Sequence, residues 1–228
     1  GIKKSKGNWI AFLDADDLWL KNRLYVLKKK IESKKFDFIS SSEIIEVQHN
    51  KTKKIWHYGF KNNNNYEKFL RFGSVFSTSA SVVKKDFIKS KKILFSEKKI
   101  FASFEDFDFF LNMAKNNASF FFLRKVLGRH LFHDNSTTEK KKNYENSLKA
   151  VIKSHVKKQK FETNKIKLLE EIMMYQNLKK NIENTIKKKN IFANLIKIFY
   201  FLVLKPIYFF KVFNVLLSRQ MNHIERLN

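Results

Sequence analysis

An acidic cluster directly after an apolar run is the feature of this sequence that most clearly suggests chemistry. Asp14, Asp16 and Asp17 follow residues 8–13, which are nearly all apolar. Three carboxylates so close together repel one another, and a divalent cation such as Mg²⁺ or Mn²⁺ relieves that repulsion because hard cations take oxygen ligands. Acids also suit the first turn of a helix, where Asp17 could act as the cap. Both interpretations, a metal site and a helix cap, stay open.

A second acidic cluster opens a segment with helical spacing, residues 104–116. Glu105, Asp106 and Asp108 lie at its start. A carboxylate there can serve as a general base that is directed into a cleft, although acids also stabilise a helix N-terminus through the helix dipole. Two of the six histidines fall within residues 129–136, where a histidine is either structural or a ligand.

The elements expected to position these residues alternate between strand and helix. The predicted strands cover residues 8–13, 36–41, 74–83, 119–123 and 126–132, and the first of them has the character of a buried parallel strand. A hairpin is expected over 43–58, with its turn at 49–51. Helices are expected over 18–35, 66–72 and 104–116. This alternation predicts an α/β layered fold with ligands bound at the strand ends.

The sequence changes character near residue 139. Residues 1–138 form the predicted α/β part, and residues 139–228 contain no glycine and have helical spacing over 147–160, 165–189 and 191–218. On a helical wheel the polar residues of 191–218 share one face, with a kink expected at Pro206. Such an amphipathic helix either lies in an anionic membrane interface or packs on protein. A membrane-spanning helix is not expected, because three lysines interrupt the segment.

Composition excludes several classes of protein. Hydrophobic residues make up 43% of the 228 residues, which is enough for a core. The absence of cysteine excludes disulfides, thiolate metal sites and a cysteine nucleophile. The net charge is +26, but 41 of the 47 basic residues are lysine. Nucleic-acid readers favour arginine, and Lys, Asn, Phe and Ile share A/T-rich codons, so no specific nucleic-acid partner is expected.

Three segments, in order, resemble the family-two glycosyltransferases of the GT-A type. Residues 1–19, which contain Phe-Leu-Asp-Ala-Asp-Asp-Leu-Trp, resemble the family stretch around its DxD motif. Residues 77–85 and 104–111 are similar to the acceptor-side strand and the helix that begins with Glu-Asp. Residues 133–138 resemble the closing His-containing segment. The resemblance covers about 1–138 and implies a Rossmann-like mixed sheet whose N-terminal nucleotide-binding half is missing, followed by an α-helical extension.

The resemblance assigns a metal-binding role to the first cluster. Asp14 and Asp16 match the DxD pair, so Asp16 would bind the divalent metal, Mg²⁺ or Mn²⁺, that bridges the donor diphosphate. Asp14 would contact the metal or the nucleotide sugar. His133 matches the histidine that completes the metal site in some members.

It also assigns the acceptor side. Asp106 matches the catalytic base of inverting members, which deprotonates the acceptor hydroxyl. Glu105 would support the acceptor or orient the base, and Trp19, which follows the DxD motif, is assigned to substrate binding.

The implied function is transfer of a sugar from a nucleotide-diphosphate sugar to a saccharide or lipid-linked acceptor. The transfer would be metal-dependent and inverting, and the implied setting is the synthesis of cell-envelope polysaccharide or lipopolysaccharide in the cytoplasm or at the inner face of the cytoplasmic membrane. Two alternatives remain: a truncated, inactive remnant of the enzyme, and a basic peripheral protein that binds membrane or nucleic acid.

Overall fold

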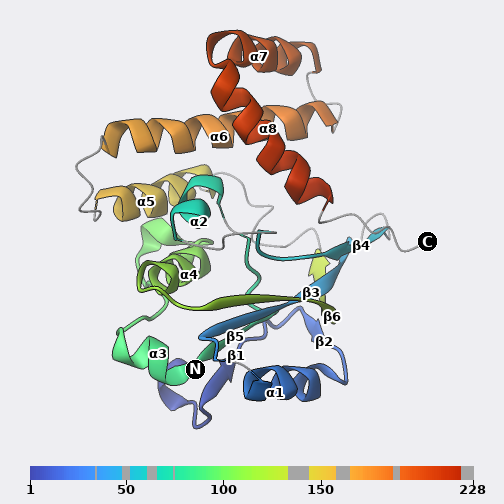
Figure 1. Cartoon of the computed structure of the whole chain (residues 1–228), viewed down its shortest axis with the longest axis vertical. Coiled ribbons are helices and arrows are strands. Elements are labelled where there is room, and N and C mark those ends of the chain that lie inside the picture. Colours follow the sequence, from blue (N-terminus) through green and yellow to red (C-terminus); the bar gives the residue numbers. More distant parts are fainter. Residues whose placement is uncertain are drawn as a thin grey trace.

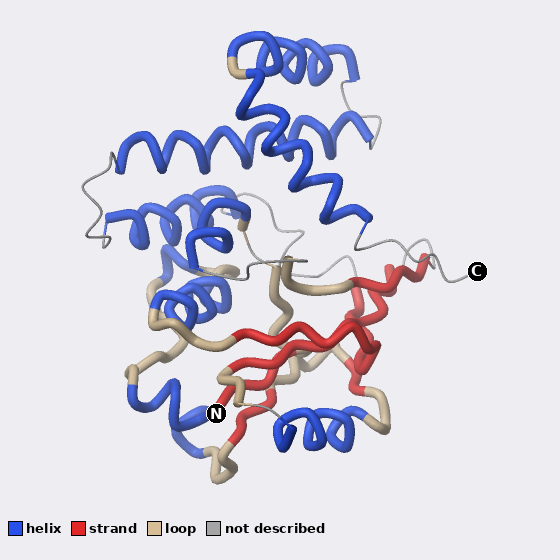
Figure 2. The backbone as a smooth tube through the Cα atoms, in the orientation of Figure 1, coloured by secondary structure: helices blue, strands red, loops and turns tan. Residues whose placement is uncertain are grey.

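The computed structural model has a mixed sheet between two helical layers (Figures 1 and 2). It describes residues 1–33, 35–47, 52–60, 66–73, 75–132, 144–157, 165–186 and 191–221. One face of the sheet is covered by α1 (Arg23–Ser33), whose Leu27 packs with Ile39, Val82 and Leu127. On the other side of the sheet lie α2 (Tyr66–Phe72) and α4 (Glu105–Lys115), and the later helices stack beyond them (Figure 1). Their side chains join those of the sheet in one large apolar cluster that is rich in phenylalanine.

The sheet has the strand order β1-β5-β3-β6-β2, with β4 paired to the far end of β3. The strands are β1 (Trp9–Ala11), β2 (Leu18–Trp19), β3 (Phe38–Val47), β4 (Thr52–Trp56), β5 (Ser81–Lys84) and β6 (Phe120–Phe132). Among the described strands, β3 and β6 pair in parallel and the other pairs are antiparallel. The predicted strand over 36–41 is therefore present, and the expected hairpin over 43–58 is confirmed as β3 and β4, whose turn residues 49–51 lie outside the described part of the chain.

The first predicted strand is present as β1, but the expectation that it is a buried parallel strand is wrong. β1 has three residues, pairs antiparallel with β5, and buries only Ile10. The flanking apolar residues have other contacts: Phe12 packs edge-on against Phe95 and Phe109. The apolar run over residues 8–13 therefore has two causes: a strand of three residues, and packing of a residue beyond it such as Phe12. It does not indicate a strand that is buried between parallel neighbours.

Serine hydroxyls shorten the strand that was expected over 74–83. The Ser77 Oγ accepts a hydrogen bond from the Ala80 amide at 3.2 Å, and the Ser81 Oγ donates to the Ser77 carbonyl at 2.5 Å. These local bonds hold a turn, so β5 begins only at Ser81. The two strands expected over 119–132 are in fact one, β6, and the irregularity between them is taken up by register shifts opposite Ser42.

The helices α2 (Tyr66–Phe72) and α4 (Glu105–Lys115) confirm the predicted helices over 66–72 and 104–116. A further short helix, α3 (Lys85–Ser90), follows β5. The helix expected over 18–35 starts only at Arg23, because Leu18 and Trp19 pair with β6 as strand β2. Asp17 consequently caps no helix, which corrects that interpretation.

In the described part of the chain after the sheet lie the helices α5 (Tyr144–Lys157), α6 (Lys165–Ile186), α7 (Ile191–Leu204) and α8 (Pro206–Met221). The segment expected as one kinked helix over 191–218 is two helices, because Pro206 lacks the amide that would continue α7. The extension shares the large apolar cluster with α2 and α4. Within the described residues, no helix combines the length and apolar character needed to cross a membrane.

Candidate active site

Ser79 fixes the acidic segment at both ends. The Asp14 amide donates to the Ser79 Oγ at 3.0 Å, and the Trp19 Nε1 donates to the Ser79 carbonyl at 3.0 Å. Because Ser79 is itself buried in the turn before β5, residues 14–19 are bound to the sheet as a short arch. In this structure the indole N–H of Trp19, which was predicted to bind substrate, is therefore engaged in holding that arch.

Asp14 and Asp16 lie on the exposed part of this arch. Partial burial of its carboxylate raises the pKa of Asp14, and the nearby charges of Asp17 and Asp16 raise it further. The repulsion among these neighbouring carboxylates that the sequence predicts therefore acts on Asp14. An arrangement of this kind favours an added positive charge.

Asp17 turns the other way and is bound by β6. Its Oδ1 accepts the Leu131 amide at 3.1 Å, and its Oδ2 lies 2.9 Å from the His130 Nδ1. Burial opposes ionisation of Asp17, but the hydrogen bonds with His130 and Ser79 outweigh it and lower the pKa of this carboxyl. Burial likewise disfavours the charged form of His130, yet Asp17 raises its pKa. Asp17 and His130 therefore tie the arch to β6 as an ion pair.

Asp106 lies at the N-terminus of α4, across from Asp14. Its Oδ1 accepts the Phe107 amide at 2.6 Å. Burial raises the pKa of Asp106 to about 6, and the charges of Glu105 and Asp14 contribute. The contribution of Asp14 shows that the two acidic clusters, which are far apart in sequence, lie close together in the fold.

Aromatic packing sets this juxtaposition. Phe12, just before Asp14, packs against Phe109, one helical turn beyond Asp106, with ring centroids 5.9 Å apart. Phe109 also stacks on Phe95 at 4.4 Å. Glu105 is beside Asp106, and its Oε2 is buried with no hydrogen-bond partner within the described ranges. The predicted residues Asp14, Asp16, Glu105 and Asp106 are thus gathered at one place.

Asp108 does not belong to this site. It is buried, and its Oδ1 lies 2.8 Å from the Nε2 of buried His155 on α5. The His155 Nδ1 is 3.0 Å from the hydroxyl of Tyr66 on α2. This chain of polar contacts joins α2, α4 and α5, so Asp108 has a structural role.

A buried polar group beneath the arch was missed by the sequence reasoning. The Arg23 Nη1 donates to the Ser41 Oγ at 2.7 Å, and its guanidinium lies over the Trp19 ring, 5.0 Å from the centroid. The Tyr58 hydroxyl donates to the Glu43 Oε2 at 2.7 Å. Burial lowers the pKa of Arg23 to about 10, with Glu43 opposing the effect. The available signal was Glu43 itself, one of two charged residues, with Glu46, in the otherwise uncharged strand β3.

The residues present fit a hard cation in part. Asp14 and Asp16 supply carboxylate oxygens, and Mg²⁺ commonly uses one or two carboxylates together with substrate phosphates and water. The third predicted ligand, His133, lies outside the described residues. In the described ranges no group of three or more His, Asp or Glu side chains is arranged to hold a metal ion.

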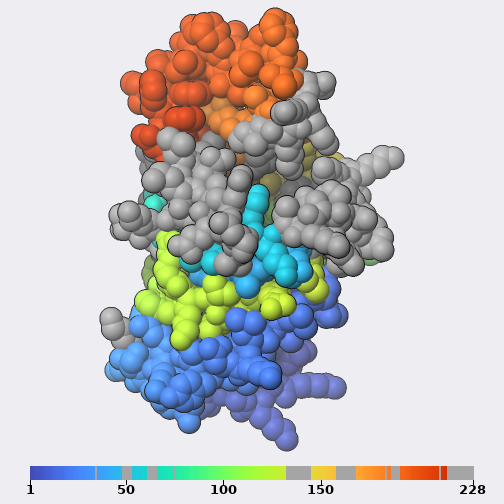
Figure 3. Space-filling view, turned by 90° about the vertical axis from the view of Figure 1, so that its right-hand side faces the viewer, coloured from blue at the N-terminus to red at the C-terminus, as the bar shows by residue number. Residues whose placement is uncertain are grey.

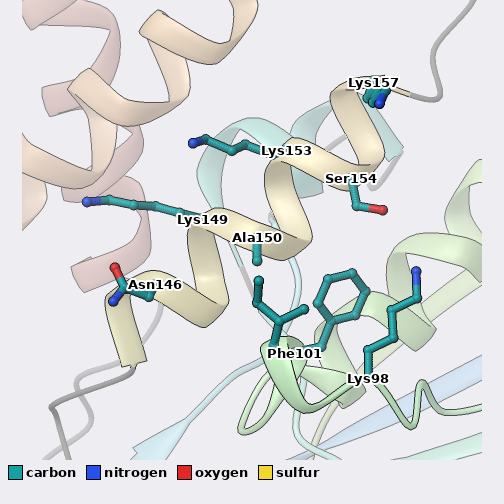
Figure 4. Close-up of a pocket in the computed structure, with 9 residues that line it drawn as sticks. Lys98, Phe101, Asn146, Lys149, Ala150, Lys153, Ser154 and Lys157 are labelled. Carbon is teal, nitrogen blue, oxygen red and sulfur yellow. The ribbon is translucent and has the colours of Figure 1, made fainter.

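A hollow of about 520 Å³ lies elsewhere, between α5 and the short 3₁₀ helix Lys99–Phe101 (Figure 4). Its lining includes Phe101, Ala150 and Lys98, but none of the candidate acids. Lys149 and Lys153 point away from Phe101 in this view. The hollow is therefore not the acidic site.

Residues 1–90 match the family model described as glycosyl transferase family 2. Over this stretch the chain is similar to the family 2 glycosyltransferases. The matched stretch contains Asp14, Asp16 and Trp19, and it ends before Glu105 and Asp106. No curated protein matches the chain.

Two solved structures of residues 1–349 of TarS from S. aureus resemble this domain. One covers 75% of this chain at 18% identity with a TM-score of 0.47, and this chain covers 48% of it. The other, in complex with UDP-GlcNAc, covers 75% at 16% identity with a TM-score of 0.50, and this chain covers 49% of it. The chain therefore spans about half the length of these structures. The second likeness confirms the predicted α/β fold of the GT-A type.

Proposed function

We propose that this domain transfers a sugar from a nucleotide-diphosphate donor to an acceptor hydroxyl. The observation that supports this most directly is that two sets of carboxylates with different environments lie close together. Asp14 and Asp16 are exposed on the arch, and Asp106, whose pKa is about 6, lies at the start of α4. The family match supports the reaction class. The TarS structure with UDP-GlcNAc supports a nucleotide-sugar donor.

In this proposal Asp106 is the general base. A carboxyl whose pKa lies near 6 is largely ionised at neutral pH and is a stronger base than an ordinary aspartate. It accepts the proton of the acceptor hydroxyl as that oxygen attacks the anomeric carbon from the side opposite the diphosphate, which leaves with the bonding electron pair. The configuration at the anomeric carbon is thereby inverted. Glu105, adjacent on the same turn, contacts the acceptor.

The arch serves the leaving group. Asp14 and Asp16 would hold a divalent cation, Mg²⁺ or Mn²⁺, which when bound supplies positive charge for the departing diphosphate. Ser79, Asp17 and His130 keep the two carboxylates in place by binding the arch to β5 and β6. The acceptor in this proposal is a saccharide or lipid-linked hydroxyl in cell-envelope polymer synthesis.

Release of UDP from UDP-GlcNAc by the full-length protein tests the assignment. We expect Asp106→Asn to lower turnover by about 10²–10⁴-fold with donor binding retained. Asp16→Ala should weaken donor binding in the presence of Mn²⁺. Asp86→Asn is a matched control, because Asp86 is an exposed acid at the equivalent second position of α3.

Full activity in both Asp106→Asn and Asp16→Ala would refute the site. A wild-type protein that binds UDP-GlcNAc in a manner dependent on Asp16, but turns over no nucleotide sugar, would instead favour an inactive remnant of the transferase.

A further inference from the structure

The last two described helices expose a continuous set of large apolar side chains. Phe192 is 79% exposed and Ile207 is 87% exposed. We call this set the α7–α8 apolar face, and its members are Phe192, Leu195, Ile196, Phe199, Tyr200, Val203, Leu204, Ile207 and Phe210. Soluble monomers rarely leave contiguous apolar patches of this kind in water, so the face calls for a partner.

The opposite sides of the same helices are already packed. On α7, Ile198, Phe201 and Leu202 pack against the large core cluster. On α8, Phe209 and Val212 are buried, and the Tyr208 hydroxyl donates to the Glu171 carbonyl of α6. The two helices are therefore anchored on one side, and the exposed side is a surplus beyond what the core uses.

The charged residues along this segment are all of one sign. From Lys187 to Met221 the sequence contains seven basic residues and no acidic residue. Lys197 and Lys205, on and just after α7, are exposed. Aromatic and aliphatic side chains flanked by lysines, on a helix that lies against protein on its other side, match the pattern of an interfacial membrane helix.

The same charge disfavours a second copy as the occupant. Joining two such faces would bring together two strongly basic helix pairs from chains that each carry a net charge of +26, and like charges at an interface oppose association. An anionic bilayer satisfies both the apolar side chains and the lysines.

The position of the face suits surface attachment. In Figures 1 and 3, α7 and the start of α8 lie at one end of the long axis, and β1 and α1 lie toward the other end. A membrane at the α7 end would not cover β1 or β2, the two strands that the acidic arch connects.

We propose that the α7–α8 apolar face binds the surface of an anionic lipid bilayer, with its aromatic and aliphatic side chains in the boundary between headgroups and acyl chains. This proposal does not depend on the proposed catalytic function.

Co-sedimentation of the full chain with vesicles tests it. Binding is expected to vesicles of phosphatidylcholine mixed with phosphatidylglycerol, with weaker binding to phosphatidylcholine alone and a decrease with added salt. A triple variant, Phe192→Ser, Phe199→Ser and Ile207→Ser, should lower the partition coefficient at least about tenfold. The matched control is Leu24→Ser with Tyr25→Ser, two exposed apolar residues on α1, each 61% exposed; it should bind as the wild type does.

A second readout needs no loss of binding. Phe199→Trp should show a blue-shifted emission on addition of anionic vesicles. The proposal is overturned if anionic vesicles fail to sediment the wild type, or if the triple variant binds them as tightly as the control does. It is also overturned if light scattering shows that the triple substitution converts a stable dimer into a monomer while vesicle binding is unchanged.

Discussion

Asp106 makes the fold less stable at neutral pH, and Asp106→Asn is expected to make it more stable. Burial raises the pKa of this carboxyl from 3.8 to about 6. The folded protein therefore binds the Asp106 proton more tightly than the unfolded chain does, and stability falls as pH rises from about 4 to 6. A pKa difference of this size corresponds to at most about 3 kcal/mol at pH 7.5.

The expected gain is smaller than this limit. Asp106 keeps some contact with solvent, which screens its charge, and its carboxylate gains from the dipole at the N-terminus of α4. We expect Asp106→Asn to raise the free energy of unfolding by roughly 1–2 kcal/mol at pH 7.5. For a chain of this length that is roughly 2–8 °C in Tm. The gain should shrink toward zero at pH 4, where Asp106 is protonated in the folded protein.

Urea unfolding of both proteins, followed by circular dichroism at pH 4 and pH 7.5, measures this difference. Asp86→Asn again provides the comparison, because it removes an exposed acid from the same position of a helix. It should lower stability at pH 7.5 by about 0.3–1 kcal/mol, through the lost dipole interaction. If Asp106→Asn also lowers stability at pH 7.5, or if its effect is the same at both pH values, Asp106 is not a buried, repelled carboxylate and the argument for a raised pKa fails.

Two further predictions concern packing. His155→Leu leaves the buried Asp108 carboxylate with Asn112 as its side-chain partner, and it should lower the free energy of unfolding by about 3 kcal/mol, measured by urea unfolding. A loss below about 1 kcal/mol would mean that the contact between α4 and α5 is not a stabilising one. Gly59→Ala should cost at least about 1 kcal/mol more than Gly73→Ala: both glycines have positive φ, but only at Gly59 would the new methyl group lie 2.4 Å from a phenylalanine ring of β6. Equal Tm values for the two variants would contradict this.

Much of the fold could be predicted from periodicity, because long elements leave clear patterns. The helices α2 and α4 and the hairpin of β3 and β4 were expected nearly at their observed bounds. The errors concern short elements. Three apolar residues in β1 cannot show whether their neighbour is parallel or antiparallel, and Leu18 and Trp19 carry helical spacing yet pair with β6. Tertiary hydrogen bonding decided both cases.

The site was predictable to the extent that its residues form local motifs. Asp14 and Asp106 each belong to a short acidic cluster, and the structure brings them together. Asp17 and His130 were not predicted as a pair, because their contact depends on β2 and β6 being neighbours, which spacing along the chain does not reveal. The buried group around Arg23 depends likewise on contacts between α1 and β3. Sequence alone could therefore indicate the acids, but not the residues that hold them.

Several acidic residues form ion pairs with a lysine or arginine, and this supports a functional interpretation of Asp14 and Asp106, which do not within the described residues. The chain has 47 basic and 21 acidic residues, so a lysine is available to almost any carboxylate. Glu46, Glu67 and Glu145 each form an ion pair with a lysine or arginine. In the described part of the chain, neither Asp14 nor Asp106 forms an ion pair with a lysine or arginine. Burial and the charges of nearby acids raise the pKa of both carboxyl groups. Stability alone would favour an ion pair with a lysine or arginine at both positions. Two carboxylates that form no such pair fit a site that is kept anionic for a positively charged ligand or for proton transfer, at the expense of stability.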